Sequence, residues 1–187
     1  MMMLTAGVLL WIAVHLFPSV LPKARASLIA RLGEGPYKGL FAVDIVIAIL
    51  LMVFGWRSAM PEYWYTPPLA GMQTVTFVLV MIAFILMGAA NAPNNLKRHL
   101  RHPMLAGVIV WSVAHLLANG DSRSVILFGG LGIWAATAII TINRREAEYE
   151  KPEPVEASKD IVLVAIGAAL TAVVAFFHEY LSGVALF

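Results

Sequence analysis

Six long apolar runs, each close to the length of a membrane-spanning helix, constrain this chain more than any other feature of its sequence. They occupy residues 4–20, 39–56, 72–90, 104–118, 124–142 and 161–181. A bilayer core of about 30 Å requires roughly 20 apolar residues in helical form. Since the backbone finds no water there, the runs are expected to form helices. The sequence therefore predicts an all-α fold, a polytopic transmembrane helical bundle of about six spans.

The composition agrees with lipid as the main solvent of the chain. Apolar residues make up 60% of the sequence and charged residues 13%, which is too little polar surface for a soluble domain of 187 residues. We expect no nucleic-acid partner. The sequence contains no cysteine, which excludes a disulfide framework, a thiolate metal site and a thiol nucleophile. The ligands of any cofactor must therefore be histidine, methionine or carboxylate side chains.

Apolar and charged stretches divide the chain into three segments. Residues 1–143 are expected to form a five-helix membrane core, 144–160 a charged and mobile cytoplasmic linker, and 161–187 an accessory C-terminal transmembrane helix. Residues 23–32 mix apolar and basic side chains after Pro22, a pattern typical of an amphipathic helix on the inner membrane surface. Gly129, Gly130 and Gly132 are expected to allow close helix packing.

The distribution of Lys and Arg between the runs predicts the orientation in the membrane. Alternate loops carry eleven and two basic residues, and Arg57 and Arg123 are the two in the poorly charged set. Cytoplasmic loops of membrane proteins collect Lys and Arg. We therefore expect a multi-pass protein of the bacterial inner membrane, in contact with membrane lipids, with basic loops in the cytoplasm and both termini in the periplasm.

His15 and His115 are the histidines placed deep within the apolar runs. Each lies eleven residues into its run, which at 1.5 Å per residue is a depth of roughly 16 Å. Ionisable groups inside a membrane are costly and point to function. Two imidazoles at one depth on facing helices can hold a haem iron from both sides, which predicts both histidines as metal ligands. The alternative is that each histidine bonds a carbonyl or a polar side chain across a helix interface.

Further residues are expected to surround this cofactor. Trp111 and Ser112 share a helical stripe with His115, so they are predicted to line the pocket. Arg101 precedes a helix at the membrane edge and is predicted to bind a haem propionate bidentately. Its alternative role is contact with anionic lipid head groups. His178 lies near the outer end of the last run and is expected to be solvated.

Four spaced motifs resemble the NnrU family, over residues 4 to 143 and without the linker and last helix. They are residues 31–41 (RLGEGPYKGLF), 65–68 (YTPP), 101–104 (RHPM) and 111–121 (WSVAHLLANGD). That family is similar to the plant zeta-carotene isomerase, a membrane enzyme with haem b. The resemblance implies His15 and His115 as axial ligands and haem-dependent cis–trans isomerisation of a lipophilic polyene. Ser112 stands where the plant enzyme has a cysteine proposed as an alternate ligand, which argues against a ligand switch of that kind.

Three alternative functions stay open beside an isomerase. The bacterial members take their name from nitrite and nitric oxide reduction, which implies a haem protein that senses a diatomic gas or transfers electrons in denitrification. Residues 101–107 (RHPMLAG), followed by Arg144, Arg145 and Glu146, are similar to membrane methyltransferases that bind S-adenosylmethionine, although Leu105 replaces a tyrosine of that motif. The third alternative is an assembly factor without a cofactor. The sequence identifies no substrate and leaves open whether the protein is an enzyme.

Overall fold

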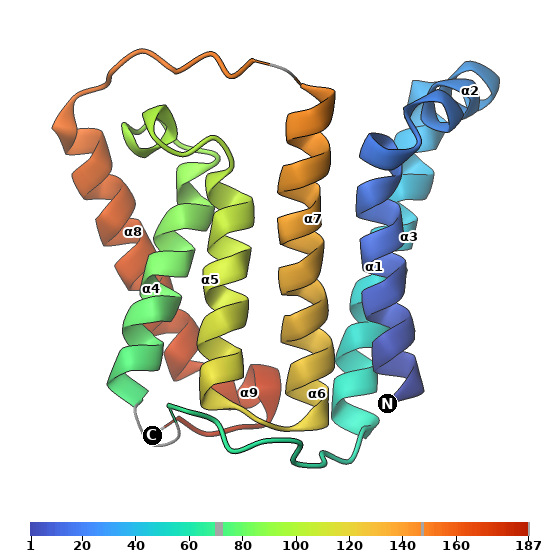
Figure 1. Ribbon diagram of the computed structural model, residues 1–187. Coiled ribbons are helices and arrows are strands. Elements are labelled where there is room, and N and C mark those ends of the chain that lie inside the picture. Colours follow the sequence, from blue (N-terminus) through green and yellow to red (C-terminus); the bar gives the residue numbers. More distant parts are fainter. Residues whose placement is uncertain (70–72, 147, 187) are drawn as a thin grey trace.

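The computed structural model describes residues 1–69, 73–146 and 148–186, and within these ranges the chain forms helices and no β-strand (Figure 1). The predicted all-α fold is therefore confirmed. The long helices are α1 (Met2–Val20), α2 (Pro22–Leu32), α3 (Glu34–Ser58), α4 (Gln73–Ala89), α5 (Pro103–Ala118), α7 (Gly130–Arg145) and α8 (Ala157–Phe176). The short ones are η1 (Leu96–Arg98), α6 (Ser122–Ser124), η2 (Val125–Gly129) and α9 (His178–Ser182).

The apolar helices agree with a polytopic membrane protein. Within the described residues, four helical stretches are long and apolar enough to cross a bilayer: α1, α3, the continuous stretch Ser122–Arg145 that joins α6, η2 and α7, and α8. Helices α4 and α5 are apolar but have 17 and 16 residues, and at 1.5 Å per residue they extend about 24 to 26 Å. Each of the six predicted runs therefore corresponds to one helical stretch, with two of them at the short limit for a span.

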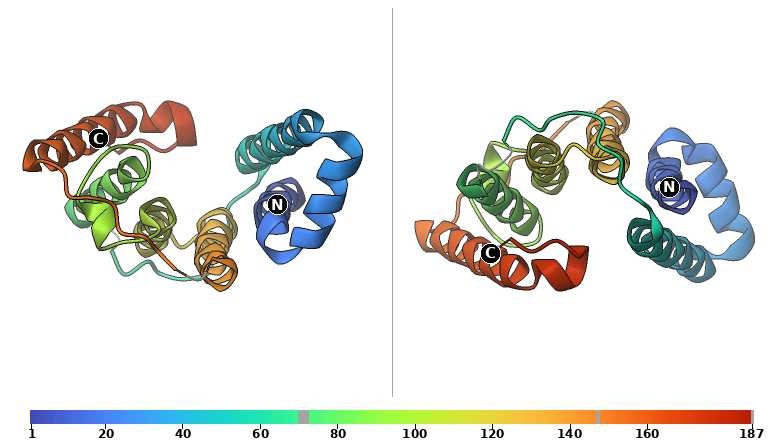
Figure 2. Two further views of the ribbon diagram at one scale, coloured as in Figure 1. Left: turned by 90° about the horizontal axis from the view of Figure 1, so that it is seen from above. Right: turned by 90° about the horizontal axis from the view of Figure 1, so that it is seen from below.

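The helices stand side by side in a curved row, which Figure 2 shows from both ends. The order along the row is α8, α4, α5, α7, α1 and α3, and each helix packs against the next. Helix α7 lies between α5 and α1. Because α3 and α9 lie on the same side of α5 and α7, the row curves around one face of these two central helices.

Small residues let neighbouring helices approach closely. A Cβ atom on Gly7 would lie 2.8 Å from the backbone nitrogen of Met52, so α1 and α3 touch through their backbones there. The expected packing role of Gly130 and Gly132 is confirmed, since added Cβ atoms would meet side chains of α1 and α5. For Gly129 this expectation is wrong, because a Cβ there would meet nothing within 4 Å.

Hydrogen bonds attach the charged linker to the loop between α4 and α5. The side-chain amide of Asn95 donates to Asp160 at 2.6 Å and to the carbonyl of Val155 at 2.9 Å. The hydroxyl of Tyr149 donates to the carbonyl of Lys97 at 2.7 Å. The irregular stretch ends at residue 156, because α8 begins at Ala157. The linker is thus held near both of its ends, and α8 packs along α4.

The two ends of the bundle differ in charge. Helix α2, the loop around η1 and the linker all lie at one end, the upper end in Figure 1, and carry the basic residues. The last turn of α3, which contains Arg57, and α6, which contains Arg123, lie at the other end, together with the N-terminus and α9. The predicted helix at 23–32 is confirmed as α2, which begins with Pro22 in its first turn.

Candidate functional site

His115 lies near the C-terminal end of α5, twelve residues after Pro103. The end of the bundle at which α5 ends is called the outer end below, after the orientation that the sequence predicts. Its Nδ1 lies 2.8 Å from the carbonyl oxygen of Trp111. A carbonyl only accepts hydrogen bonds, so Nδ1 carries the proton and Nε2 keeps a free lone pair. No described residue forms a hydrogen bond with this Nε2. The ring stacks on Phe128 with the ring centres 4.2 Å apart, so its orientation is fixed.

His15 on α1 is held in the same way. Its Nδ1 lies 2.9 Å from the carbonyl oxygen of Trp11, and its ring stacks on the Trp11 ring at 4.0 Å. Trp134 of α7 meets the imidazole edge-on, with ring centres 5.0 Å apart. Residues 11–16 (WIAVHL) and 111–116 (WSVAHL) share the pattern Trp-x-x-x-His-Leu. This repeated pattern is a sequence signal for a common role of the two histidines.

Of the two predicted pocket residues, Trp111 lies at the site and Ser112 does not. The Trp111 ring contacts both His115 and Phe128, at 4.9 and 4.8 Å between ring centres. Ser112 is only 2% exposed and faces α7, where a Cβ on Gly132 would come within 3.1 Å of it. Its hydroxyl forms no hydrogen bond with the described part of the chain. Ser112 therefore serves the contact between α5 and α7.

Phe128, which the sequence prediction missed, belongs to a π-helical turn. This turn is η2, Val125–Gly129, inserted between α6 and α7. Such turns often mark functional sites because they shift the side chains of a helix out of its regular order. Phe128 is buried, stacks on His115 and meets Trp56 of α3 edge-on at 6.1 Å. No residue type in this stretch of the sequence signals a π turn.

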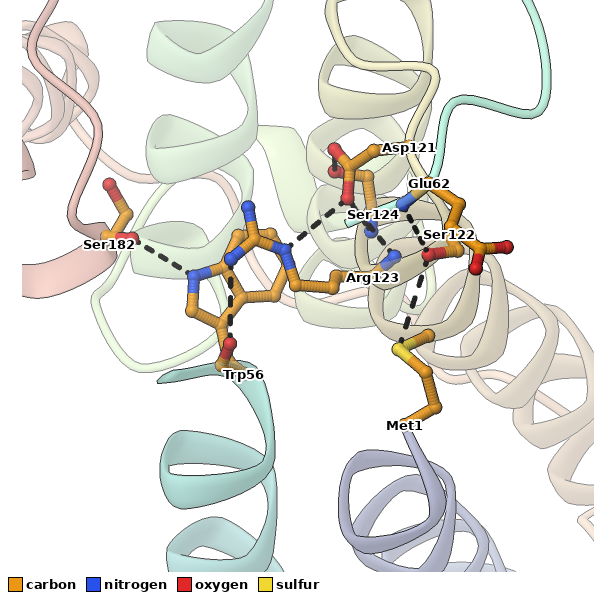
Figure 3. A network of polar contacts seen from close by, with 8 residues as sticks. All are labelled: Met1, Trp56, Glu62, Asp121, Ser122, Arg123, Ser124 and Ser182. Atoms are coloured by element: carbon orange, nitrogen blue, oxygen red, sulfur yellow. Dashed lines mark hydrogen bonds and ion pairs between the residues drawn. The ribbon is translucent and has the colours of Figure 1, made fainter. Parts of the chain in front are cut away.

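A polar network at the outer end of the bundle was also missed (Figure 3). Asp121 accepts hydrogen bonds from the backbone N–H of Arg123 and Ser124, at 3.0 and 3.2 Å, and from the Ser124 hydroxyl at 2.7 Å. Burial raises the pKa of the Asp121 carboxyl, but these bonds and the Arg123 guanidinium outweigh it and bring the pKa below its ordinary value. The carboxylate thus stays charged and caps α6.

A cavity of about 320 Å³ adjoins this network. Its lining residues come from the end of α3, from α6 and from the C-terminal segment: Trp56, Arg57, Arg123, Glu179, Tyr180, Ser182, Gly183 and Val184. The indole N–H of Trp56 donates to the carbonyl of Ser182 at 2.9 Å, which joins α3 to α9. His178 of α9 is half-buried, so its expected solvation is only partial.

Arg101 lies at the opposite end of the bundle from His115. Its guanidinium donates to the backbone carbonyl of Glu146 at 2.9 Å and lies 5.6 Å from the centre of the Tyr149 ring. Hydrogen bonding by Arg145, with a further contribution from Arg101, holds the pKa of the Glu146 carboxyl below its usual range. The structure therefore brings together the two segments that resemble methyltransferases, but it does not bring Arg101 to His115.

The comparison with known protein families assigns the chain. A family model described as NnrU protein matches residues 3–186. The chain belongs to the NnrU family. The match continues through the linker and α8, so the limit at residue 143 expected from the motifs is corrected. No curated protein and no solved structure matches this NnrU protein.

The arrangement of helices decides how the histidines of this NnrU protein fit a haem. Helix α7 lies between α1 and α5. In the helical stretch that includes α7, the His115 ring contacts Phe128 and the His15 ring contacts Trp134, and these two partners are six residues apart. Six residues correspond to a rise of about 9 Å. The expectation of two facing helices with both imidazoles at one depth is therefore wrong. Each free Nε2 fits one axial position, but the pair does not fit a single shared iron.

Proposed function

We propose that this NnrU protein is an integral membrane protein that binds haem b through Nε2 of His115. The observation that supports the proposal is the bond from Nδ1–H to the Trp111 carbonyl, which leaves Nε2 as a lone-pair donor beside apolar rings. Ligating histidines generally donate their other nitrogen in this way. A haem held by His115 would supply a redox-active iron to the site.

The residues around His115 have separate tasks in this proposal. The Trp111 carbonyl fixes the tautomer and makes Nε2 more basic. Phe128 supports the flat face of the imidazole and keeps water away from it. His15 repeats the same arrangement with Trp11, so it offers a second, separate imidazole ligand on α1. It would share the iron of His115 only if α1 moved along α7.

We propose cis–trans isomerisation of a lipophilic polyene as the reaction. The implied likeness of the family to zeta-carotene isomerase favours it, and many exposed large apolar side chains on α3 and α8 would let such a substrate approach from the bilayer. A haem held at the site would supply the reversible electron exchange that lowers the double-bond order of the polyene, with no net redox change in the isomerisation. A second candidate is binding of a diatomic gas, because a haem held by His115 alone would keep coordination capacity for such a ligand.

An absorption spectrum of the purified protein tests the cofactor. We expect a Soret band with the features of five-coordinate high-spin haem. The His115→Ala variant should lose the bound haem, whereas His15→Ala and His102→Ala should retain it. A protein without haem after expression with adequate haem supply, or a wild-type spectrum for His115→Ala, would refute the proposal. Six-coordinate low-spin bands lost in both His15→Ala and His115→Ala would instead show that both histidines ligate one iron.

Two assays separate the candidate activities. Carbon monoxide added to the reduced protein should shift the Soret band if the open axial position is accessible. Incubation of the reduced protein with a cis-polyene, followed by chromatography of the isomers, reports isomerisation. A shift with carbon monoxide but no change in isomer ratio would favour the gas-binding function.

A further inference from the structure

Arg57 and Arg123 are the two basic residues outside the basic loops, and both line the same cavity. The eleven other Lys and Arg residues belong to α2, the loop around η1, the linker and the adjoining helix ends, at the opposite end of the bundle. Arg57 belongs to the last turn of α3 and Arg123 to α6, sixty-six positions later in the chain. The fold thus brings the only two cations of the outer loops together at one cavity of about 320 Å³. Such a convergence is typical of an anion site.

The cavity holds its two guanidinium groups in different ways (Figure 3 shows Arg123). Arg123 lies over the Trp56 ring, 4.6 Å from its centre, with its side chain 19% exposed. Its Nε lies 3.5 Å from an oxygen of Asp121, but makes no hydrogen bond to any residue that the structure describes. Arg57 is exposed and donates to the carbonyl of Tyr180 at 3.4 Å. Both groups therefore keep donors for a further ligand.

Two carboxylates offset part of this positive charge. Asp121 forms an ion pair with Arg123, and Glu179 is itself one of the lining residues. Arg57 has no ion-pair partner within residues 1–69, 73–146 and 148–186. A ligand with one or two carboxylates would therefore pair with Arg57 and complete the coordination of Arg123.

Contacts between rings connect this cavity with His115. The His115 imidazole stacks on Phe128, Phe128 meets Trp56, and Trp56 lies under Arg123. Arg101 is far away by comparison, because twelve residues of α5 separate His115 from the end where Arg101 lies, a distance of about 18 Å. The cations nearest to the proposed haem ligand are therefore those of the outer cavity.

We propose that Arg57 and Arg123 bind the propionate groups of the haem held by His115. The sequence alone predicts this role for Arg101. The inference rests on the proposed function and deepens it. Guanidinium groups bind carboxylates through paired, charge-assisted hydrogen bonds. The Glu179 carboxylate repels the propionates, so the affinity of the cavity for haem is lower than it would be without this residue.

Titration with haem and with haem dimethyl ester tests the role of the two arginines. The ester keeps the iron and the macrocycle but lacks the charged propionates. Protein expressed under haem limitation is titrated in detergent and followed by the Soret band. Wild-type protein should bind haem at least about tenfold more tightly than the ester. Arg57→Gln and Arg123→Gln should each reduce this preference several-fold and leave the affinity for the ester unchanged. Arg101→Gln is the matched control and should keep the wild-type preference, while Glu179→Gln should increase it.

The outcomes separate this inference from the proposed function. If haem binds through His115 but Arg57→Gln and Arg123→Gln keep the full preference, the inference fails and the proposed function stands. If Arg101→Gln alone abolishes the preference, the propionates lie at the other end. If wild-type protein binds neither compound, or His115→Ala binds both as well as wild type, both are refuted. Because Arg57 is exposed, Arg57→Gln should fold. The inference can therefore be tested with this variant even if Arg123→Gln fails to fold.

Discussion

The Asp121 carboxylate shows how one residue stabilises the outer end of the site. It caps α6 through three hydrogen bonds and lies beside Arg123. We expect Asp121→Ala to lower the free energy of unfolding by about 1–2 kcal/mol, as loss of an N-cap does. Thermal unfolding of the detergent-solubilised protein at pH 7 measures the loss. Ser58→Ala, which changes an exposed hydroxyl bonded only within its own helix, should cost little.

The same carboxylate makes stability depend on pH in a known direction. The folded pKa of Asp121 lies below its unfolded value, which is about 3.9. Its contribution is therefore fully present above that unfolded pKa and is lost as pH falls through the folded pKa. The difference between wild type and Asp121→Ala should be constant from pH 5 to 8 and shrink below about pH 4. An equal difference at pH 3 and pH 7 would contradict this assignment.

At this scale the sequence predicted the histidines better than their surroundings. His15 and His115 stand out because few ionisable residues lie inside the apolar runs. The prediction that both histidines lie at the same depth is wrong because α5 has only 16 residues. His115 is far from the inner end of this short helix and therefore close to its outer end. Phe128 and Trp56 could not be predicted, since a π turn and a contact between distant helices depend on tertiary packing.

Among the elements, α1 and α3 touch through their backbones, and Gly7 lies at one of these close contacts. A Cβ there would lie 2.8 Å from the Met52 nitrogen and 2.9 Å from the Ala48 carbonyl. Since both atoms belong to the backbone, they cannot move aside as a side chain can. We expect Gly7→Ala to lower the stability by about 1–3 kcal/mol through overpacking, measured by thermal unfolding in detergent.

Gly39 provides the matched control on the partner helix. It lies in α3, and a Cβ there would meet nothing within 4 Å. Gly39→Ala should therefore leave stability unchanged or raise it by up to about 1 kcal/mol, because alanine favours a helix more than glycine does. Equal destabilisation by both substitutions would show that backbone propensity, and not the close contact, determines the effect.

The linker between α7 and α8 is attached to the loop between α4 and α5. Asn95 bonds Asp160 and Val155 across the loop and the start of α8. We expect Asn95→Ala to increase the rate of cleavage by a glutamate-specific protease in the linker about tenfold, because loss of these bonds lets the segment open more often. Ser158→Ala is the control, since its hydroxyl bonds only Glu156. Unchanged cleavage in Asn95→Ala would show that other contacts hold the linker.

Helix positions could be predicted from the sequence, but not helix order. The apolar runs and the helices coincide closely, as at 104–118 and Pro103–Ala118, because the length of an apolar segment follows directly from composition. The placement of α7 between α5 and α1 depends on contacts far apart in the sequence, such as Gly132 against Ser112. The hydrogen bonds of Asn95 to the linker are of the same kind, and polar linker composition alone suggested a mobile segment.

For the whole molecule, the separation of charge between the two ends determines the expected orientation. The end with α2, η1 and the linker carries eleven basic residues, and the end with the N-terminus and α9 has Arg57 and Arg123. The rule that cytoplasmic loops are basic predicts that the first end faces the cytoplasm. Reporter fusions at residue 150 should then be active in the cytoplasm and fusions at residue 66 in the periplasm. The reverse pattern would invert the orientation, and equal labelling of both positions would exclude an odd number of spans between them.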